Sequence, residues 1–348
     1  MSEKVNRKLL KAALVSLAVL IVSLIVLGAF ELIVKGISAR LDYLKTGSRW
    51  SADGSPFAVV AVNTEDSAGF DFDQLYAYEM SMNSALNEAS VATDNTHRAW
   101  TWNASFETVQ SISGPKDTAS ATTTVCAGDF FVFHNMKFIS GSGFLNDTSN
   151  PMGVVLDKNL AWKIFGAIDV VGMTLYIGDE EYTVSGVCEP YGKTGVRGYT
   201  YGESPRLYMS YPGFAKVGSG NFTCYEAAMP NPVRSFAKNI FDSVVSVNGN
   251  TADETEATAR FTLKNRFDNM KKLKYSWISS NRISYPYWEN EARVYDYRCA
   301  VMMVVEVIFA ALAGISLVSA LILTVGSGYS PVRSVKNVID KKLSSRKK

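Results

Sequence analysis

Long apolar stretches lie near both ends of the chain. Residues 12–30 contain no charge, and residues 299–332 contain a single charge, Glu306. A helix needs roughly 20 apolar residues to cross a hydrocarbon core about 30 Å thick. The first stretch is longer than the apolar region of a signal peptide and lacks an Ala-x-Ala exit. The pattern therefore predicts two transmembrane helices, over 12–34 and 300–329.

The stretch between them has the mixed pattern of an ordinary folded domain. Alternating or short apolar runs predict strands, and apolar residues one turn apart predict helices. We expect strands at 57–62, 173–177, 181–187, 222–228 and 243–247, helices at 71–89, 157–165, 231–241 and 252–275, and loops with edge strands over 91–124. Gly166 follows one of these helices directly, as a C-terminal cap would. Strands and helices mix, so we expect an α+β domain flanked by two transmembrane α-helices.

Lysine and arginine residues predict the orientation of the spans. They occur on both sides of the first span, which leaves it undecided. The second span is preceded closely by Arg293 and Arg298 and followed by Arg333, Lys336, Lys341, Lys342, Arg346, Lys347 and Lys348. We therefore expect both termini in the cytoplasm of a cell whose inner membrane holds the chain. The expected parts are a cytoplasmic N-terminus (1–11), a first span (12–34), an extracytoplasmic domain (36–298), a second span (300–329) and a basic cytoplasmic tail (330–348).

Small residues recur four positions apart in the second span. Ala310 pairs in this way with Gly314, and Ser316 with Ala320. Such spacing lets a neighbouring helix approach closely in lipid, although it also arises by chance in alanine-rich spans. We name these four residues as candidates for helix packing.

The four cysteines are Cys126, Cys188, Cys224 and Cys299, and none forms a CxxC pair. Neither a metal site nor a cofactor site is therefore expected. Cys188 and Cys224 both fall on expected strands of an extracytoplasmic domain, so a disulfide between them is the pairing we favour. Isolated buried thiols are the alternative. The net charge of +2 gives no reason to expect a nucleic-acid partner.

Residues that could support catalysis are sparse. Ser113 and Lys116 match a Ser-x-x-Lys pattern, but they flank a Gly-Pro turn rather than open a helix. The two histidines, His97 and His134, have no acid partner in a triad-like spacing. Glu31 and Glu306 lie near the outer ends of the spans, where headgroups or water can reach them. We expect no enzymatic activity and name no catalytic residue.

A family resemblance is visible in the middle of the chain. Residues 125–131 read Val-Cys-Ala-Gly-Asp-Phe-Phe and are followed by Gly141. Residues 153–166 read Gly-Val-Val-Leu-Asp-Lys-Asn-Leu-Ala-Trp-Lys-Ile-Phe-Gly, residues 169–173 Asp-Val-Val-Gly-Met and residues 182–187 Tyr-Thr-Val-Ser-Gly-Val. This order resembles the periplasmic core domain of MacB-like ABC transporter permeases: a strand, a Leu-Ala helix ending in Phe-Gly, an Asp-Pro-x-Gly turn and a Tyr-x-Val-x-Gly-Val strand. Residues 287–294 resemble the Trp-Glu-Asn segment that leads into the second span of permease-like proteins.

The chain departs from the pattern in two ways. Val170 stands where the family usually has proline, and two spans are expected where the usual permeases have four, with an Arg-Glu-Ile-Gly-like coupling segment after the second. No G-x-x-x-x-G-K-[ST] phosphate loop is present, so ATP hydrolysis would have to come from another chain.

The resemblance implies a non-catalytic membrane subunit of an ABC assembly that relays conformational change during export or efflux. Its partners would be an ABC ATPase subunit, a four-span permease or both, with the lipid bilayer and a second copy of the chain as further contacts. Because such a relay needs rigid coupling, we expect residues 287–298 to continue as helix into the second span. The alternative is a membrane-tethered sensor or scaffold that has lost transport.

Overall fold

The computed structural model describes residues 3–51, 54–91, 98–144, 151–192, 194–276 and 282–326. The chain divides into two compact units. The domain unit comprises Ser38–Tyr297, and the helical unit comprises the chain up to Ile37 and from Arg298 onward.

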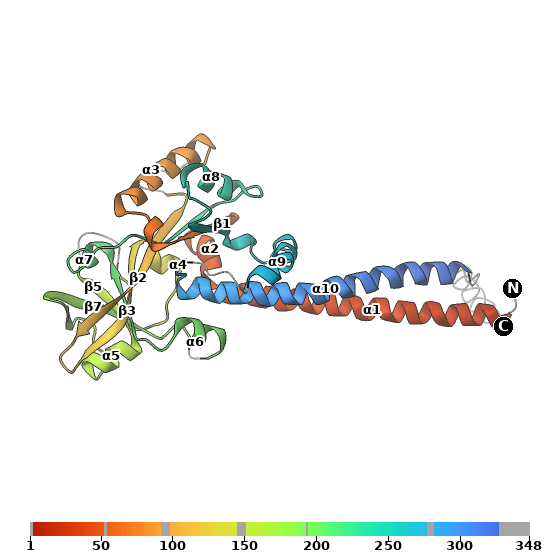
Figure 1. Cartoon of the computed structure of the whole chain (residues 1–348), viewed down its shortest axis with the longest axis horizontal. Coiled ribbons are helices and arrows are strands. Elements are labelled where there is room, and N and C mark those ends of the chain that lie inside the picture. Colours follow the sequence, from red (N-terminus) through yellow and green to blue (C-terminus); the bar gives the residue numbers. More distant parts are fainter. Residues whose placement is uncertain are drawn as a thin grey trace, which may run out of the picture. The chain divides into compact units, whose positions relative to one another are not determined.

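The domain unit is built on one ten-stranded sheet (Figure 1). Its strands follow the order β10-β1-β9-β2-β3-β8-β5-β7-β4, and β6 pairs with β2 and β7 beside this path. Their bounds are β1 Phe57–Thr64, β2 Thr101–Ser113, β3 Thr118–Gly128, β4 Phe138–Gly141, β5 Gly153–Asp157, β6 Thr174–Ile177, β7 Glu180–Cys188, β8 Arg206–Ser210, β9 Cys224–Pro230 and β10 Ala252–Glu256. Helices alternate with these strands, which confirms the mixed architecture.

The helices are of very different length. They are α1 Glu3–Arg40, α2 Thr46–Trp50, α3 Phe72–Glu88, α4 Phe130–Phe133, α5 Lys158–Phe165, α6 Gly195–Tyr201, α7 Tyr211–Phe214, α8 Phe236–Val244, α9 Leu263–Ser276 and α10 Tyr287–Gly326, with 3-10 turns η1 Asp42–Lys45, η2 Asp66–Ala68 and η3 Ala257–Ala259. Local chemistry explains two of the boundaries. Asp71 and Gln74 form a reciprocal capping box at the start of α3. Gly166 ends α5 in the left-handed conformation, with a φ of +76°.

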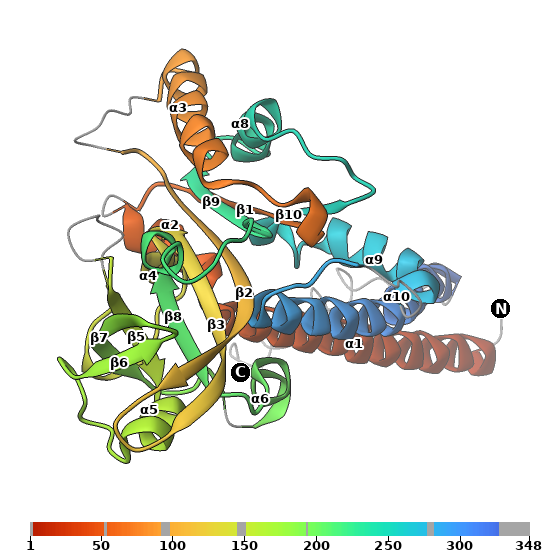
Figure 2. The same cartoon turned by 60° about the vertical axis from the view of Figure 1, so that its left-hand side comes forward.

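The prediction of loops and edge strands over 91–124 is wrong for the two strands that lie at the centre of the sheet, while residues 92–97 lie outside the described residues. Strands β2 and β3 are the longest of the sheet and form one antiparallel hairpin (Figure 2). Their polar residues misled the prediction, because Thr, Ser and Asn fill buried positions here, among them Asn103, Ser105 and Thr124. β-branched Thr suits a pleated strand, and the neighbouring strands on both sides supply the backbone hydrogen bonds.

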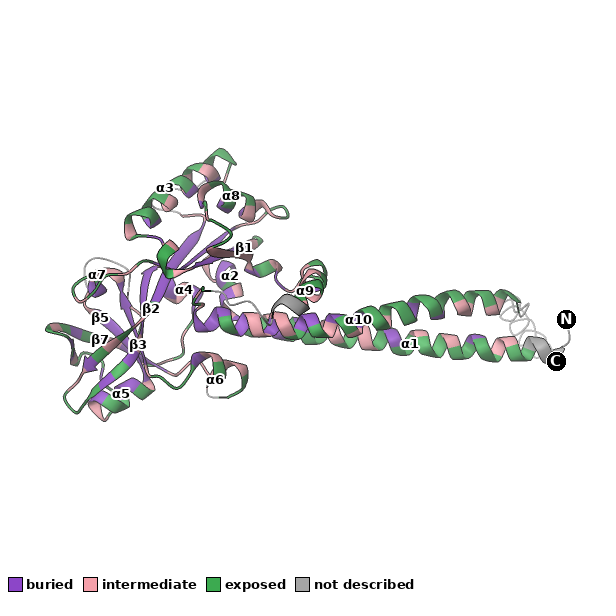
Figure 3. Ribbon diagram, viewed as in Figure 1, coloured by how far each residue is buried: buried purple, intermediate pink, exposed green. Residues whose placement is uncertain are grey.

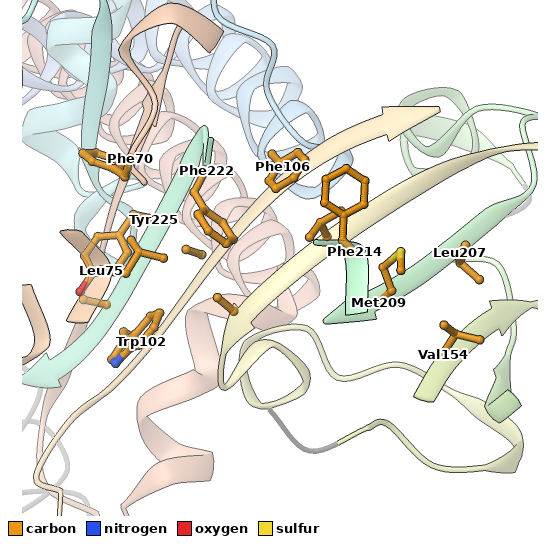
Figure 4. Close-up of a cluster of buried hydrophobic side chains, with 14 of the residues drawn as sticks. Phe70, Leu75, Trp102, Phe106, Val154, Leu207, Met209, Phe214, Phe222 and Tyr225 are labelled. Carbon is orange, nitrogen blue, oxygen red and sulfur yellow. The ribbon is translucent and has the colours of Figure 1, made fainter. Parts of the chain in front are cut away.

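Both faces of the sheet are covered, and its central strands are buried over most of their length, whereas β4, β10 and the second half of β2 are partly exposed (Figure 3). One face carries the large core under α3, α5, α7 and α8, which includes Trp102, Phe106, Met209, Phe222 and Tyr225 (Figure 4). The other face carries a second cluster, made of Cys126, Phe130, Val155, Cys188, Tyr201, Tyr208, Cys224, Tyr287 and Trp288. Neighbouring residues of one strand alternate between the two clusters, as the pleat requires.

Three further expectations are corrected near the end of the domain unit. Helix α8 begins at Phe236 rather than at residue 231, and it continues to Val244, so no strand occupies 243–247. The range 252–275 is not one helix, because β10 and η3 come before α9. The acidic segment Ala252–Glu256 pairs with β1 at the edge of the sheet, and this tertiary pairing overrides its low strand propensity.

Two glycines in the motifs that resemble the MacB-like family stand where a side chain would clash. Gly141 and Gly186 lie opposite each other where β4 pairs with β7. A Cβ at Gly141 would come within 2.1 Å of the Ser185 carbonyl oxygen, and one at Gly186 within 2.5 Å of the Ser142 carbonyl oxygen. Gly141 also has a φ of +67°. The close approach of the two strands therefore excludes any side chain at either position.

The predicted Cys188–Cys224 disulfide is not formed. Both residues are buried free thiols, as are Cys126 and Cys299. Cys188 ends β7 and Cys224 begins β9, and the sheet places β2, β3, β8 and β5 between those two strands. Neighbouring strands lie about 4.8 Å apart, whereas a disulfide needs Cα atoms within about 7 Å. The isolated buried thiols, which were the alternative, are what the structure shows.

In the helical unit, α1 and α10 each qualify by length and composition as a membrane-crossing helix. The two helices lie side by side in this unit (Figures 1 and 2). Large apolar side chains along both are exposed, among them Leu14, Ile25, Leu312 and Ile322. A continuous apolar surface of this kind suits lipid rather than water. The basic tail expected at 330–348 lies outside the described residues.

Candidate functional site at the start of helix α10

Helix α10 begins inside the domain unit rather than at its surface. Tyr287 and Trp288 are 3% and 1% exposed and belong to the second cluster of the sheet. The Trp288 ring centroid lies 5.7 Å from that of Phe130 and 3.9 Å from that of His134. Aromatic residues next to a span often belong to a belt at the lipid interface, whereas these two are buried in the domain. They hold the first turn of α10 against the sheet.

A buried guanidinium ties two turns of this segment to the domain. Arg260 directly follows η3 and is 3% exposed. Its Nη2 donates to both carboxylate oxygens of Glu289, at 2.7 and 2.8 Å, and its Nη1 donates to Asp296 Oδ2 at 3.0 Å. Glu289 and Asp296 are seven residues apart and therefore share one face of α10. One arginine thus spans two helical turns.

The surroundings of Arg260 keep it charged. Burial alone would lower the pKa of Arg260, but Glu289, Tyr43 and Asp296 act in the opposite direction and raise it well above its ordinary value. For the Tyr43 hydroxyl, burial acts in the other direction and raises the pKa. The guanidinium presents several donors in a fixed fork, so it can serve two carboxylates together.

The other side of the segment is held through Glu291, which is completely buried. Glu291 accepts a hydrogen bond from the Tyr191 hydroxyl at 2.5 Å and one from Arg197 Nε at 3.0 Å. Burial, followed by the hydrogen bond to Glu291, raises the pKa of Tyr191. Arg197 also donates to the carbonyl oxygen of Arg40, the last residue of α1. The same arginine therefore contacts the last residue of α1 and the start of α10.

A third contact comes from the edge strand β10. Arg293 donates to Asp253 Oδ2 at 2.6 Å, and the Tyr285 hydroxyl donates to the same oxygen at 3.0 Å. The Arg293 guanidinium also lies 4.0 Å from the Tyr285 ring centroid. We call the four pairs Arg260–Glu289, Arg260–Asp296, Arg197–Glu291 and Arg293–Asp253 the α10 anchor.

A buried histidine lies beneath Trp288. His134 Nε2 is 2.8 Å from Glu226 Oε2, and Asn103 Nδ2 donates to the same oxygen at 2.9 Å. Asn103 on β2 and Glu226 on β9 face each other in the strand register, which places the carboxylate at the centre of the sheet. The aromatic floor on which α10 begins is therefore itself fixed by buried hydrogen bonds.

Together these groups hold the start of α10 in place. Breaking a buried ion pair by removing one partner costs about 3–5 kcal/mol, because the remaining charge is left uncompensated. The anchor therefore resists any displacement of the segment Tyr287–Tyr297. Among the described residues, no group of three or more His, Cys, Asp and Glu side chains is placed to hold a metal ion.

The sequence located only part of this site. The segment 287–294 stood out through its Trp-Glu-Asn pattern, but its partners Arg197, Arg260 and Asp253 did not, because they lie 29 to 94 residues away in the chain. A lone arginine in a loop carries no local signal for a buried partner.

The helix-packing candidates lie on different sides of α10. Ala310 and Gly314 are exposed, and a Cβ added to Gly314 meets nothing within 4 Å. Ser316 is 7% exposed and Ala320 is half-buried. Ala310 and Gly314 thus form a free surface in the described chain, and their contact with another helix stays a prediction.

Comparison with protein-family models identifies the family. The model for the MacB-like periplasmic core domain matches residues 13–261, more than half of the chain. The chain therefore belongs to the MacB-like periplasmic core domain family.

Solved structures give similar domains at low identity. The periplasmic region of MacB from Actinobacillus actinomycetemcomitans is 15% identical, with a TM-score of 0.41 over 60% of this chain and 92% of that one. The extracellular domain of the noncanonic ABC-type transporter YknZ from Gram-positive bacteria is 12% identical, with a TM-score of 0.37 over 57% of this chain and 99% of that one. A domain of a putative permease protein from Porphyromonas gingivalis is 12% identical, with a TM-score of 0.34 over 58% of this chain and 92% of that one. No curated protein matches the chain.

Proposed function

We propose that this protein is a non-catalytic, permease-type membrane subunit of an ABC transporter assembly. It relays conformational change between membrane helices and the periplasm during export or efflux. Its family and its two flanking apolar helices support the class of protein. The proposal places 12–34 and 300–329 in the inner membrane, 36–298 in the periplasm, and 1–11 and 330–348 in the cytoplasm.

The observation that best supports the proposed relay is the continuity of α10. The expected helix over 287–298 is confirmed, because α10 runs without interruption from Tyr287 to Gly326. Its segment Tyr287–Arg298 contains neither proline nor glycine, the residues at which helices usually kink. The α10 anchor fixes this segment to the sheet. A tilt or rotation of the helix in the bilayer would therefore move the domain rather than be absorbed at a hinge.

Partners must supply what this chain lacks. The sequence contains no phosphate-binding loop, so the energy source is an ABC ATPase subunit acting directly or through a four-span permease. Two helices cannot enclose a path across a bilayer, so a second copy of the chain is a further contact. Ala310 and Gly314 give the exposed side of α10 a small-residue surface on which another helix can pack.

Assembly can be tested by co-purification. The full chain, tagged and expressed at its native level, is extracted in mild detergent, and the bound proteins are identified by mass spectrometry. We expect an ABC ATPase or a four-span permease in the eluate. Gly314→Leu should reduce its recovery several-fold, whereas Val318→Leu, on an exposed and already bulky position, should leave it unchanged. Recovery of the isolated chain alone would contradict the proposal and favour a membrane-tethered sensor or scaffold.

A further inference from the structure

Helix α9 leaves large apolar side chains in solvent. Leu263 and Phe267 are 62% and 39% exposed, and Met270 is half-buried. Positions three and four residues apart share one side of a helix, so these three side chains form one stripe. Arg266, in contrast, is 1% exposed and faces the interior of the domain unit. The stripe is therefore the outer side of a helix whose inner side is already packed.

Cationic side chains border this stripe. Lys264 and Lys271 are both exposed. The Lys271 ammonium lies 4.4 Å from the Phe267 ring centroid and 3.2 Å from Asp268 Oδ1. Asp268 is the only acidic residue of α9, so the exposed face carries excess positive charge. We call Leu263, Lys264, Phe267 and Lys271 the basic face of α9.

Contacts inside the domain unit place this face near the end of the domain from which α10 continues as the expected span. Helix α9 begins three residues after Arg260, which is paired with Asp296. Asp296 precedes the expected span at residue 300 by about one helical turn, or roughly 6 Å of helix axis. A helix that starts so close to this point is within reach of lipid headgroups.

We propose that the basic face of α9 binds the anionic phospholipid headgroups of the leaflet through which α10 enters the bilayer. Lys264 and Lys271 pair with headgroup phosphates, while Leu263 and Phe267 enter the headgroup–acyl boundary. Amphipathic helices with lysine and exposed Leu or Phe side chains bind membrane surfaces in this way, and anionic lipid strengthens the binding. The proposal requires α10 to cross the membrane but needs no ABC partner, so its test and the co-purification test fail independently.

The test uses the full chain reconstituted in nanodiscs. Thr262→Cys provides an exposed thiol next to the stripe, and the native cysteines are at most 2% exposed, so an environment-sensitive fluorophore attaches at one site. Quenching of this fluorophore by nitroxide-labelled lipid is compared between phosphatidylcholine discs and discs with about one-third phosphatidylglycerol. We expect quenching at least twofold greater in the anionic discs, and weaker at high salt because exposed charges are screened.

Charge reversal identifies the lysines. The variant Lys264→Glu/Lys271→Glu should lose the extra quenching, and each single reversal should lose part of it. The control reverses two lysines of α5: Lys158→Glu/Lys163→Glu. This control should keep the extra quenching. Should the double variant unfold, the single reversals decide the question.

Two results would overturn the proposal. Equal quenching in neutral and anionic discs would show that headgroup charge is not recognised. Loss of the extra quenching on adding inorganic phosphate at constant ionic strength would show that the face binds free phosphate instead of lipid.

Discussion

Removing Arg260 tests the α10 anchor at its most buried point. In Arg260→Met, Glu289 loses both hydrogen bonds that it accepts at 2.7 and 2.8 Å, and Asp296 loses the one at 3.0 Å. The side chains of Arg260 and Glu289 are only 2% and 4% exposed, so water cannot replace the lost partner. The carboxylate of Glu289 is then a buried charge without a counter-ion.

The expected cost is about 3–5 kcal/mol, the usual penalty for removing one partner of a buried ion pair. In a domain of this size each kcal/mol corresponds to roughly 2–4 °C, so the unfolding midpoint should fall by about 6–20 °C. The double variant Arg260→Met/Glu289→Leu removes both charges and should recover most of this loss, because apolar residues of similar volume often replace a buried pair without penalty.

Thermal unfolding of the full chain in detergent, followed by tryptophan fluorescence, measures these shifts. Lys271→Met is the matched control, because its partner Asp268 is 42% exposed and exposed pairs contribute about 0–1 kcal/mol. If Arg260→Met unfolds within about 4 °C of the wild type, as the control should, the anchor does not hold α10.

Three further changes have defined outcomes. Gly47→Ala should cost about 1–3 kcal/mol by overpacking, because its Cβ would lie 2.2 Å from Phe57 Cβ, whereas Gly249→Ala meets nothing within 4 Å and should be neutral in the same melt. Burial raises the pKa of Asp157 above its ordinary value, so the folded chain keeps a proton that the unfolded chain releases above about pH 4. The free energy of unfolding should therefore fall as pH rises from that point through the raised pKa. Asp157→Asn keeps the cap of α5 but cannot ionise, so its free energy of unfolding, measured by urea titration at each pH, should not show this fall. An unchanged slope would show that Asp157 ionises normally. Maleimide should label no thiol of the native chain, and all four thiols after unfolding without reductant. Labelling of only two thiols after unfolding would show that Cys188 and Cys224 are disulfide-bonded after all.

Much of the fold was readable because its signals are local. The alternation of 173–187 predicts the β6–β7 hairpin, and Asp157 with Gly166 predicts both ends of α5. The apolar terminal stretches predict the long helices α1 and α10 by length alone. These features depend on neighbours in sequence and need no tertiary information.

The errors share one physical cause, which is tertiary context. Thr124 and Asn103 are buried in the sheet although their residue types suggested loops. The segment Ala252–Glu256 becomes a strand only because β1 offers it an edge. Cys188 and Cys224 were paired because both fall on expected strands of an extracytoplasmic domain, without knowledge of the strand order that separates them.

The anchor is also a tertiary feature. The Trp288-Glu289 pattern was visible in the sequence. The partners of the charged residues of this segment, however, come from a different loop, helix or strand in each case. Only the three-dimensional arrangement shows that Arg260 serves two carboxylates and that Arg197 contacts both Glu291 and Arg40.

Hydrogen exchange of the segment Tyr287–Tyr297 tests the central claim most directly. The full chain in nanodiscs is exposed to deuterated water, and exchange is followed by mass spectrometry. Amides held by a buried, ion-paired helix open only with the surrounding structure, so this segment should exchange as slowly as β2 and β3. Exchange of the wild-type segment within seconds, while the sheet stays protected, would show a flexible joint and contradict the relay.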